Sequence, residues 1–458
     1  MARLNTTALY RATALLIWAL ALWHCWLVRG LFVDGSAILV DMIKDGGYAT
    51  FYAARRHVMA LTQWPVVTAL DLGVTDTQAL ARLFSAGLFF LPTAFYHACL
   101  FRTRRDPVLL AAVVCTIAIV FLPTSFFIAG EYNSVGAAVL FAVLVLATGA
   151  RPTVGDGLLL VATAALLVRS YETMCGYGPL LAVLTLWRLS SASGWRSGAS
   201  VLYGLAVLLF LASAAVAVQS LVGPHVEGHL SSAVADVVVF WRNLQFVLPL
   251  AALVVVAVAG LVAPDLLSSR RLYLWAGVLL VLAALSPLLW LSDGTVRPFA
   301  KSHYPSRMMA GLVTAGIVVA IWLHALRPSW MPAALAALAK PAAARCFLGF
   351  QMATLLAALP ADIVLSELWR RSIVEFQATI AKRSGPIPVD ETALSRDPFI
   401  YMIEDWTLSS QSLLLRHSHG DGIVVPPRGF SNWQPFDAKK ELPRNAEKYL
   451  WGDQGRMP

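Results

Sequence analysis

Residues 9–32 read LYRATALLIWALALWHCWLVRGLF. As an α-helix this stretch is long enough to cross a bilayer, because about 20 mostly apolar residues span the ~30 Å hydrocarbon core. It is too long for the apolar region of a secretory signal peptide, and no small-x-small cleavage site follows it. The sequence therefore predicts a first membrane-spanning helix that stays in the mature protein.

The same pattern recurs along the chain. The residues are 58% hydrophobic and only 13% charged, against roughly 25% charged in a soluble domain. We therefore expect an all-α polytopic membrane protein with about eleven transmembrane helices. The further apolar stretches are 78–101, 107–128, 134–150, 157–173, 174–188, 200–222, 244–263, 273–292, 308–326 and 346–366.

The basic residues predict the orientation. Short arginine clusters follow the even-numbered stretches, at Arg102, Arg104 and Arg105, at Arg188 and Arg196, and at Arg270 and Arg271. Because cytoplasmic loops of membrane proteins are enriched in Lys and Arg, we expect a cytoplasmic N-terminus. The same bias accounts for most of the net charge of +9, so no nucleic-acid partner is expected.

With this orientation we expect a transmembrane catalytic domain at 1–366 and a periplasmic C-terminal tail at 367–458. Within the tail, Leu365 to Lys382 has a helical apolar pattern that would suit a helix lying on the membrane surface. The tryptophans Trp406, Trp433 and Trp451 favour a small packed appendage. The composition and the absence of eukaryotic sorting signals favour a bacterial inner membrane and a role in the cell envelope.

The first outer loop, from Val33 to about Thr77, is the longest connection before the tail. It is expected to hold two short interfacial helices, one stopped by Gly46-Gly47 and one from Thr50 to Leu61. Asp34 stands where the first span leaves the membrane. Its carboxylate could take a proton from an acceptor hydroxyl as a general base, or could merely cap the following helix.

Basic residues in the outer loops contradict the orientation rule and need a reason. Arg55, Arg56, Arg169 and Arg307 are such residues. Guanidinium groups grip phosphate oxygens in a fork, so a lipid phosphate is one natural partner. Pairing with acids of the same face is the alternative for about half of these cations.

Acidic residues accompany these cations. Glu172 follows Arg169 at a spacing of three, which predicts an ion pair between the two at the membrane rim. Glu131 lies in an apolar turn with no basic residue near it in sequence. Its carboxylate must therefore pair with a residue from a distant part of the chain, bind a substrate or metal, or stay protonated.

A further polar segment, Lys301-Ser-His303-Tyr304-Pro305-Ser-Arg307, precedes the tenth span. His303 is a candidate proton shuttle or headgroup contact, and Pro305 argues against one regular helix holding both His303 and Arg307. The five cysteines form no C-x-x-C pair, and no zinc, P-loop or dinucleotide motif is present. No metal site is indicated by these patterns.

The layout resembles the glycosyltransferase C (GT-C) superfamily of multi-spanning enzymes that use lipid-linked sugars. In that family a long outer loop follows the first span, and an Asp at its start is the usual catalytic residue, often in an Asp-Glu pair. The match here is Asp34, with Gly46-Gly47 and Tyr48 further along. Gly35 stands where the second acid is expected, so Asp41 or Asp45 could take the catalytic role instead.

The resemblance implies transfer of a sugar from a polyprenyl-phosphate donor to a glycan or lipid acceptor on the periplasmic face, among membrane lipids. Asp34 would deprotonate the acceptor while Arg55, Arg56, Arg169 or Arg307 stabilises the departing phosphate. Glu131 and Glu172 would hold sugar hydroxyls, or a divalent metal ion where one is used; His303 and Tyr304 would add contacts to the substrate. Alternatives are an O-antigen-ligase-like or polymerase-like enzyme, a transporter or flippase of a lipid-linked precursor, and a structural subunit of an envelope complex.

Overall fold

A computed structural model describes residues 5–49, 53–125, 131–149, 151–190, 198–222, 235, 237–292, 303–427 and 448–452. Within these ranges, nine helices are long and apolar enough to cross a membrane. They are α1 (Thr6–Trp26), α4 (Thr77–Thr103), the continuous stretch Pro107–Thr124 made of α5, a π-helical turn and α6, α7 (Glu131–Thr148), α10 (Gly198–Val222), α12 (Leu244–Val262), α13 (Arg270–Ser292), α14 (His303–Leu326) and α16 (Pro341–Ala381). The all-α polytopic architecture is therefore confirmed.

Two shorter helices coincide with the remaining predicted stretches. They are α8 (Val154–Leu167), of 14 residues, and α9 (Met174–Ser190), of 17 residues. Neither reaches the about 20 residues that an untilted helix needs to cross the hydrocarbon core. The count of about eleven spans therefore stays a prediction.

Local sequence explains where several helices begin. The side chain of Asp106 accepts hydrogen bonds from the backbone N–H groups of Val108 and Leu109 and so caps α5. Thr153 caps α8 and Asn243 caps α12 in the same way. These caps satisfy N–H groups that have no partner inside the helix.

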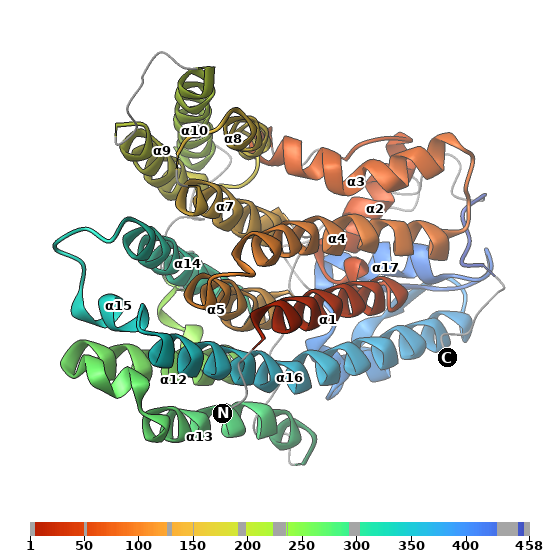
Figure 1. The fold of residues 1–458 in the computed structure, drawn as a ribbon. Coiled ribbons are helices and arrows are strands. Elements are labelled where there is room, and N and C mark those ends of the chain that lie inside the picture. Colours follow the sequence, from red (N-terminus) through yellow and green to blue (C-terminus); the bar gives the residue numbers. More distant parts are fainter. Residues whose placement is uncertain are drawn as a thin grey trace.

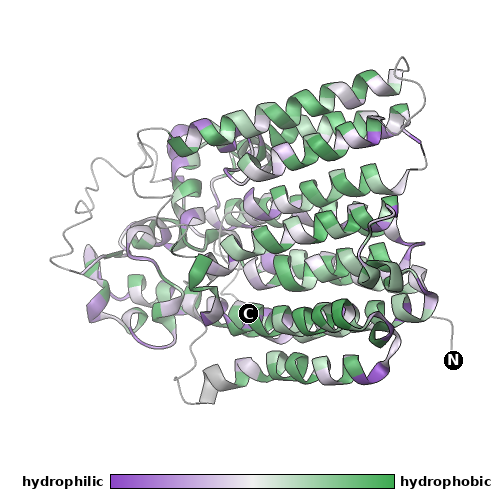
Figure 2. Cartoon of the chain, turned by 90° about the vertical axis from the view of Figure 1, so that its left-hand side faces the viewer, coloured by the Kyte–Doolittle hydropathy of each residue, from purple (hydrophilic) through white to green (hydrophobic). Residues whose placement is uncertain are grey.

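The helices form one layered bundle (Figure 1), and the two most buried spans are Pro107–Thr124 and α7. Helix α13 is the least buried span and exposes large apolar side chains, among them Leu274 and Trp275. Hydrophobic residues run along most of each helix (Figure 2), and hydrophilic residues gather near the helix ends. A surface of this kind suits contact with lipid.

The last span is one continuous helix of 41 residues. At 1.5 Å per residue it is about 60 Å long, roughly twice the hydrocarbon thickness. The prediction of a separate surface helix at Leu365 to Lys382 is therefore wrong. The apolar pattern was real, but it faces protein: Leu368, Trp369 and Phe376 are buried.

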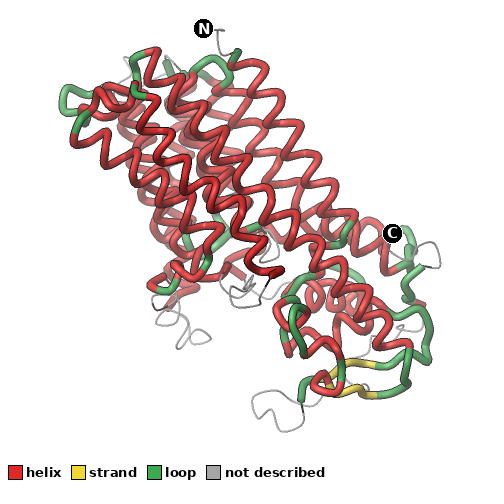
Figure 3. Tube along the Cα trace, turned by 90° about the horizontal axis from the view of Figure 1, so that it is seen from below, coloured by secondary structure: helices red, strands yellow, loops and turns green. Residues whose placement is uncertain are grey.

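The described tail is packed, as expected, around the protruding end of α16. It contains α17 (Leu408–Leu415) and two short parallel strands, β1 (Pro386–Pro388) and β2 (Ile423–Val425). Figure 3 shows the strands at the end of the molecule that holds the tail. Trp451 is buried and Trp406 is partly buried in this core, whereas Trp433 lies outside the described residues.

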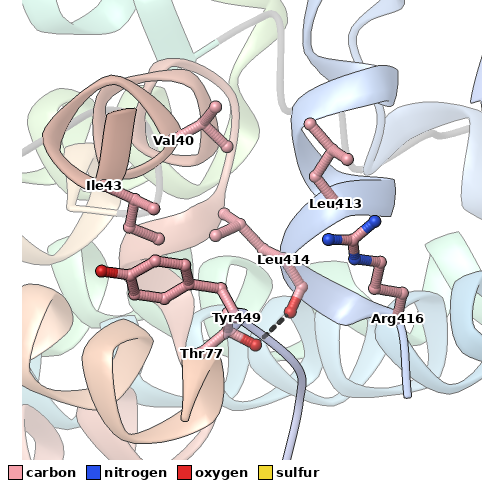
Figure 4. Close-up of a pocket in the computed structure, with 7 residues that line it drawn as sticks. All are labelled: Val40, Ile43, Thr77, Leu413, Leu414, Arg416 and Tyr449. Carbon is pink, nitrogen blue, oxygen red and sulfur yellow. Dashed lines mark hydrogen bonds between the residues drawn. The ribbon is translucent and has the colours of Figure 1, made fainter. Parts of the chain in front are cut away.

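The tail also covers the first loop, which holds α2 (Asp34–Asp45) and α3 (Arg56–Asp71). Val40 and Ile43 of α2 face Leu413 and Leu414 of α17 across a small cavity of about 20 Å³ (Figure 4). The hydroxyl of Thr77, at the start of α4, donates a hydrogen bond of 2.6 Å to the carbonyl of Leu414. The tail therefore contacts the helix whose first residue is Asp34.

The two loop helices differ in how well they were predicted. Helix α2 ends at Gly46 in a left-handed conformation with φ of 62°, as the glycine pair predicts. Helix α3 begins later and runs ten residues further than the predicted Thr50 to Leu61. Residues 50–52 lie outside the described part of the chain.

Candidate functional site

Polar contacts between helices occur at both ends of the bundle. At one end the hydroxyl of Tyr132, at the start of α7, donates to the carbonyl of Arg307, at the start of α14, over 2.5 Å. At the other end lie the pairs Arg102–Asp156 at 2.6 Å, His324–Asp106 at 3.8 Å and Lys340–Asp265 at 3.2 Å. Which end faces the cytoplasm stays a prediction.

Asp34 lies at the first end, after a sharp turn. Helix α1 stops at Trp26, and Val28 and Val33 both have positive φ, of 47° and 50°. β-Branched residues rarely adopt this conformation, so the turn fixes where α2 starts. Val33 occupies the cap position with no side-chain hydrogen bond, and the carboxylate of Asp34 is therefore not used as a cap.

Asp34 is half-buried, and the charges of two arginines act on its carboxylate. Burial raises the pKa of Asp34 above its ordinary value, and the charges of Arg307 and Arg55 partly oppose that rise. A carboxylate with a raised pKa is a stronger base than an exposed one. Asp34 therefore has the charge environment that a general base needs.

Arg55 joins the first loop to the turn before α9. Its Nε lies 3.0 and 3.2 Å from the two carboxylate oxygens of Glu172, and its Nη2 lies 3.0 Å from Oε2. The guanidinium also covers the ring of Tyr171, 4.4 Å from its centroid. The predicted pairing of Glu172 with Arg169 is therefore wrong, because Glu172 meets a cation from a distant part of the chain.

Arg307 is 2% exposed and lies between two tyrosine rings. Its Nη2 donates a hydrogen bond to the hydroxyl of Tyr171. Its guanidinium lies 5.0 Å from the ring centroid of Tyr132 and 5.4 Å from that of Tyr171. Helix α14 begins at His303 and contains both Pro305 and Arg307, so the expected break at Pro305 is wrong: a proline in the first turn of a helix is tolerated.

Glu131 is the first residue of α7 and is 3% exposed. It interacts electrostatically with Arg55, Arg307 and Asp34. Its Oε2 atom is buried without a hydrogen-bond partner in the part of the chain that the structure describes. The charges that act on Glu131 thus come from the first loop and from α14, which are distant from it in sequence.

The side chains of three other predicted residues form no hydrogen bond or ion pair with this cluster in the described part of the chain. Arg56 is exposed on α3, and Asp41 is half-buried on α2, where its charged neighbours are Lys44 and Asp45. Arg169 is half-buried and contributes its carbonyl, which accepts a hydrogen bond of 2.9 Å from the backbone N–H of His57.

The side chains of His303 and Tyr304 lie outside what the structure describes.

Two tyrosines of the cluster were missed by sequence reasoning. Tyr132 follows Glu131 directly, and Tyr171 precedes Glu172 directly. An aromatic residue beside an acid at a helix end is a weak signal, but it was available. Arg307 lies against both rings, and Arg55 lies over the ring of Tyr171.

A second buried cluster was also missed. Asp362 of α16 accepts a hydrogen bond of 2.9 Å from Arg29, and its other carboxylate oxygen lies 2.8 Å from Nε2 of His24 of α1. The Nη1 atom of Arg29 also reaches the hydroxyl of Ser366 at 3.0 Å. The available signal was the presence of charged residues inside two apolar stretches, which membrane helices rarely carry without a partner.

No protein-family model, no curated protein and no solved structure matches this chain. Within the described ranges, no three His, Cys, Asp or Glu side chains gather closely enough to hold a metal ion.

Proposed function

We propose that the protein is a membrane glycosyltransferase of the GT-C type that transfers a sugar from a polyprenyl-phosphate donor to a glycan or lipid acceptor. The observation that carries this proposal is that Asp34 lies within electrostatic reach of Arg55 and Arg307 at one end of an apolar bundle. A base beside two guanidinium groups suits a reaction that takes a proton from one substrate and releases a phosphate from the other.

In the proposed step the carboxylate of Asp34 accepts the proton of an acceptor hydroxyl. The acceptor oxygen forms a bond to the anomeric carbon of the sugar as the bond from that carbon to the phosphate oxygen breaks. The electron pair leaves with the polyprenyl phosphate, and a direct displacement of this kind inverts the anomeric carbon. Arg55 and Arg307 stabilise the charge on the departing phosphate.

Glu131 has the role of a substrate contact. Its buried oxygen without a hydrogen-bond partner in the described residues could accept a hydrogen bond from a sugar hydroxyl. Such a contact would replace a missing partner, and leaving a buried acceptor unsatisfied costs free energy. Glu172, already paired with Arg55, has the role of positioning that arginine.

The test compares two conservative variants of one helix, Asp34→Asn and Asp41→Asn. The full chain, purified in detergent, is incubated with a panel of polyprenyl-phosphate sugars and acceptors, and released polyprenyl phosphate is measured. Asp34→Asn is expected to lose about 10²- to 10⁴-fold in turnover, while Asp41→Asn keeps wild-type turnover. Full turnover in Asp34→Asn would remove the proposed base.

A second arm tests the reaction class. The wild-type chain in sealed vesicles is given the same donors. Movement of the intact donor across the membrane, with no release of polyprenyl phosphate, would replace the transferase proposal with transport of a lipid-linked precursor.

A further inference from the structure

A groove lies between the first turns of α13 and α16, at the end of the bundle opposite Asp34. The two helices pack side by side (Figure 1) and begin at the same end. The ion pair of Lys340 with Asp265 and the contact of Cys346 with the carbonyl of Ser268 fix their starts together. The groove has a volume of about 800 Å³.

The mouth of the groove is positively charged. Arg270 is the first residue of α13, and Arg345 lies in the second turn of α16; both line the groove and both are exposed. The N-terminal ends of the two helices add the positive ends of their dipoles at the same place. The mouth therefore favours an anion.

Below the mouth the groove is apolar and open. Leu280 of α13 and Phe350 of α16 form part of its lining, together with Gly277 and Gly349. A Cβ atom added to either glycine would meet no other atom within 4 Å. The space beside the glycines is therefore unfilled by protein, and neighbouring Trp275 is exposed on the same apolar helix.

We propose that this groove binds one anionic phospholipid, with its phosphate between Arg270 and Arg345 and an acyl chain along Gly277 and Gly349. The combination of charge at the mouth and apolar surface below it decides the occupant. A free phosphate ion would leave the apolar floor uncovered, and a zwitterionic lipid would bring a positive group to two arginines. The site is separate from the proposed transferase site and does not depend on it.

The test measures lipid binding to the full-length protein in neutral detergent by native mass spectrometry. Dioleoyl-phosphatidylglycerol and dioleoyl-phosphatidylcholine are titrated separately, and inorganic phosphate serves as a competitor. We expect one phosphatidylglycerol to bind preferentially. The double variant Arg270→Gln/Arg345→Gln should weaken phosphatidylglycerol binding roughly thirtyfold, because each cation near an anionic headgroup contributes about a fivefold gain in affinity.

Matched variants make the result specific. Arg271→Gln removes the adjacent charge, which does not line the groove, and should leave binding unchanged. Gly349→Leu should weaken binding by filling the floor, whereas Gly204→Leu, at another open glycine on α10, should not. Gel filtration and a thermal midpoint check that each variant stays folded.

Three results would overturn the proposal. An equal loss in Arg271→Gln would indicate diffuse surface charge. Equal binding of phosphatidylcholine would indicate an apolar groove without headgroup selection, and displacement by inorganic phosphate would indicate a simple anion site.

Discussion

Arg55 and Glu172 are 117 residues apart in the sequence, yet the guanidinium of one contacts both carboxylate oxygens of the other at 3.0 to 3.2 Å. The pair joins the first loop to the turn between α8 and α9. Its side chains are 17% and 18% exposed, so water screens the attraction less than at an open surface. Arg55 is thereby held over the ring of Tyr171, where its charge acts on Asp34.

The pair should therefore couple measurably. In a double-mutant cycle of Arg55→Ala and Glu172→Ala, we expect a coupling free energy of unfolding of about 1 to 2 kcal/mol. The control is the exposed pair of Arg383 and Glu391, with side chains 61% and 49% exposed, for which about 0.5 kcal/mol is expected. Equal coupling in the two cycles would show that the buried pair has no special role in the fold.

Asp34 should act on stability and activity in opposite directions. Because burial raises its pKa, the folded state disfavours the charged carboxylate, and stability present at low pH is lost as the pH rises through the folded-state pKa. The asparagine of Asp34→Asn cannot ionise. At pH 7.5 the free energy of unfolding of this variant should therefore be at least as large as that of the wild type. This advantage should shrink as the pH falls toward the ordinary carboxyl pKa of about 4.

The pH dependence of activity should show the opposite effect of Asp34. If Asp34 is the base, kcat/KM of the wild type should fall on acidification, with an apparent pKa above about 4. Asp34→Asn should show no such limb in any residual activity. An Asp34→Asn protein that is both inactive and clearly less stable at pH 7.5 would point to a structural role for the carboxylate.

The sequence predicted the apolar helices because apolar length is a local property. Each predicted apolar stretch overlaps a helix of the structure, and Asp106, Thr153 and Asn243 cap helices where polar residues interrupt apolar runs. Helix ends that depend on backbone geometry were harder to predict. The first helix stops at Trp26 because Val28 turns left-handed, which nothing in its side chain predicts.

Membership of the site stays a prediction, and one of its pairings was wrong. Asp34, Glu131 and Arg307 stood out as charges at helix ends, and in the structure Asp34 and Arg307 both act electrostatically on Glu131. Sequence neighbours were assumed to pair, so Glu172 was assigned to Arg169. Which cation reaches a carboxylate depends on how the first loop lies on the bundle, and that packing is invisible in a single sequence.

The buried cluster at Asp362 should be a stability determinant. Its side chain is 2% exposed and meets Arg29 and His24, so Asp362→Ala would leave a buried guanidinium without its carboxylate. We expect a loss of about 3 to 5 kcal/mol in the free energy of unfolding. Glu391→Gln, in the exposed pair with Arg383, should lose at most about 1 kcal/mol, and a comparably small loss in Asp362→Ala would contradict the inferred role.

Gly35 should be essential for the position of Asp34. A Cβ atom at this residue would lie 1.6 Å from the carbonyl oxygen of Gly30, a rigid backbone atom that cannot yield without moving the turn. This contact also explains why an acid cannot stand beside Asp34 here, where the resemblance to the GT-C superfamily expects one. Gly35→Ala should therefore shift the start of α2, costing about 1 to 3 kcal/mol.

The matched control for this change is Gly136→Ala in α7, where an added Cβ meets nothing within 4 Å and alanine favours the helix by about 1 kcal/mol. Unfolding free energies and release of polyprenyl phosphate are measured for both variants. Gly136→Ala should keep wild-type turnover with an unfolding free energy equal to or above that of the wild type. Gly35→Ala should lose activity out of proportion to stability, because the carboxylate moves relative to Arg55 and Arg307. Wild-type turnover in Gly35→Ala would mean that the close contact at Gly30 does not set the geometry of the reacting carboxylate.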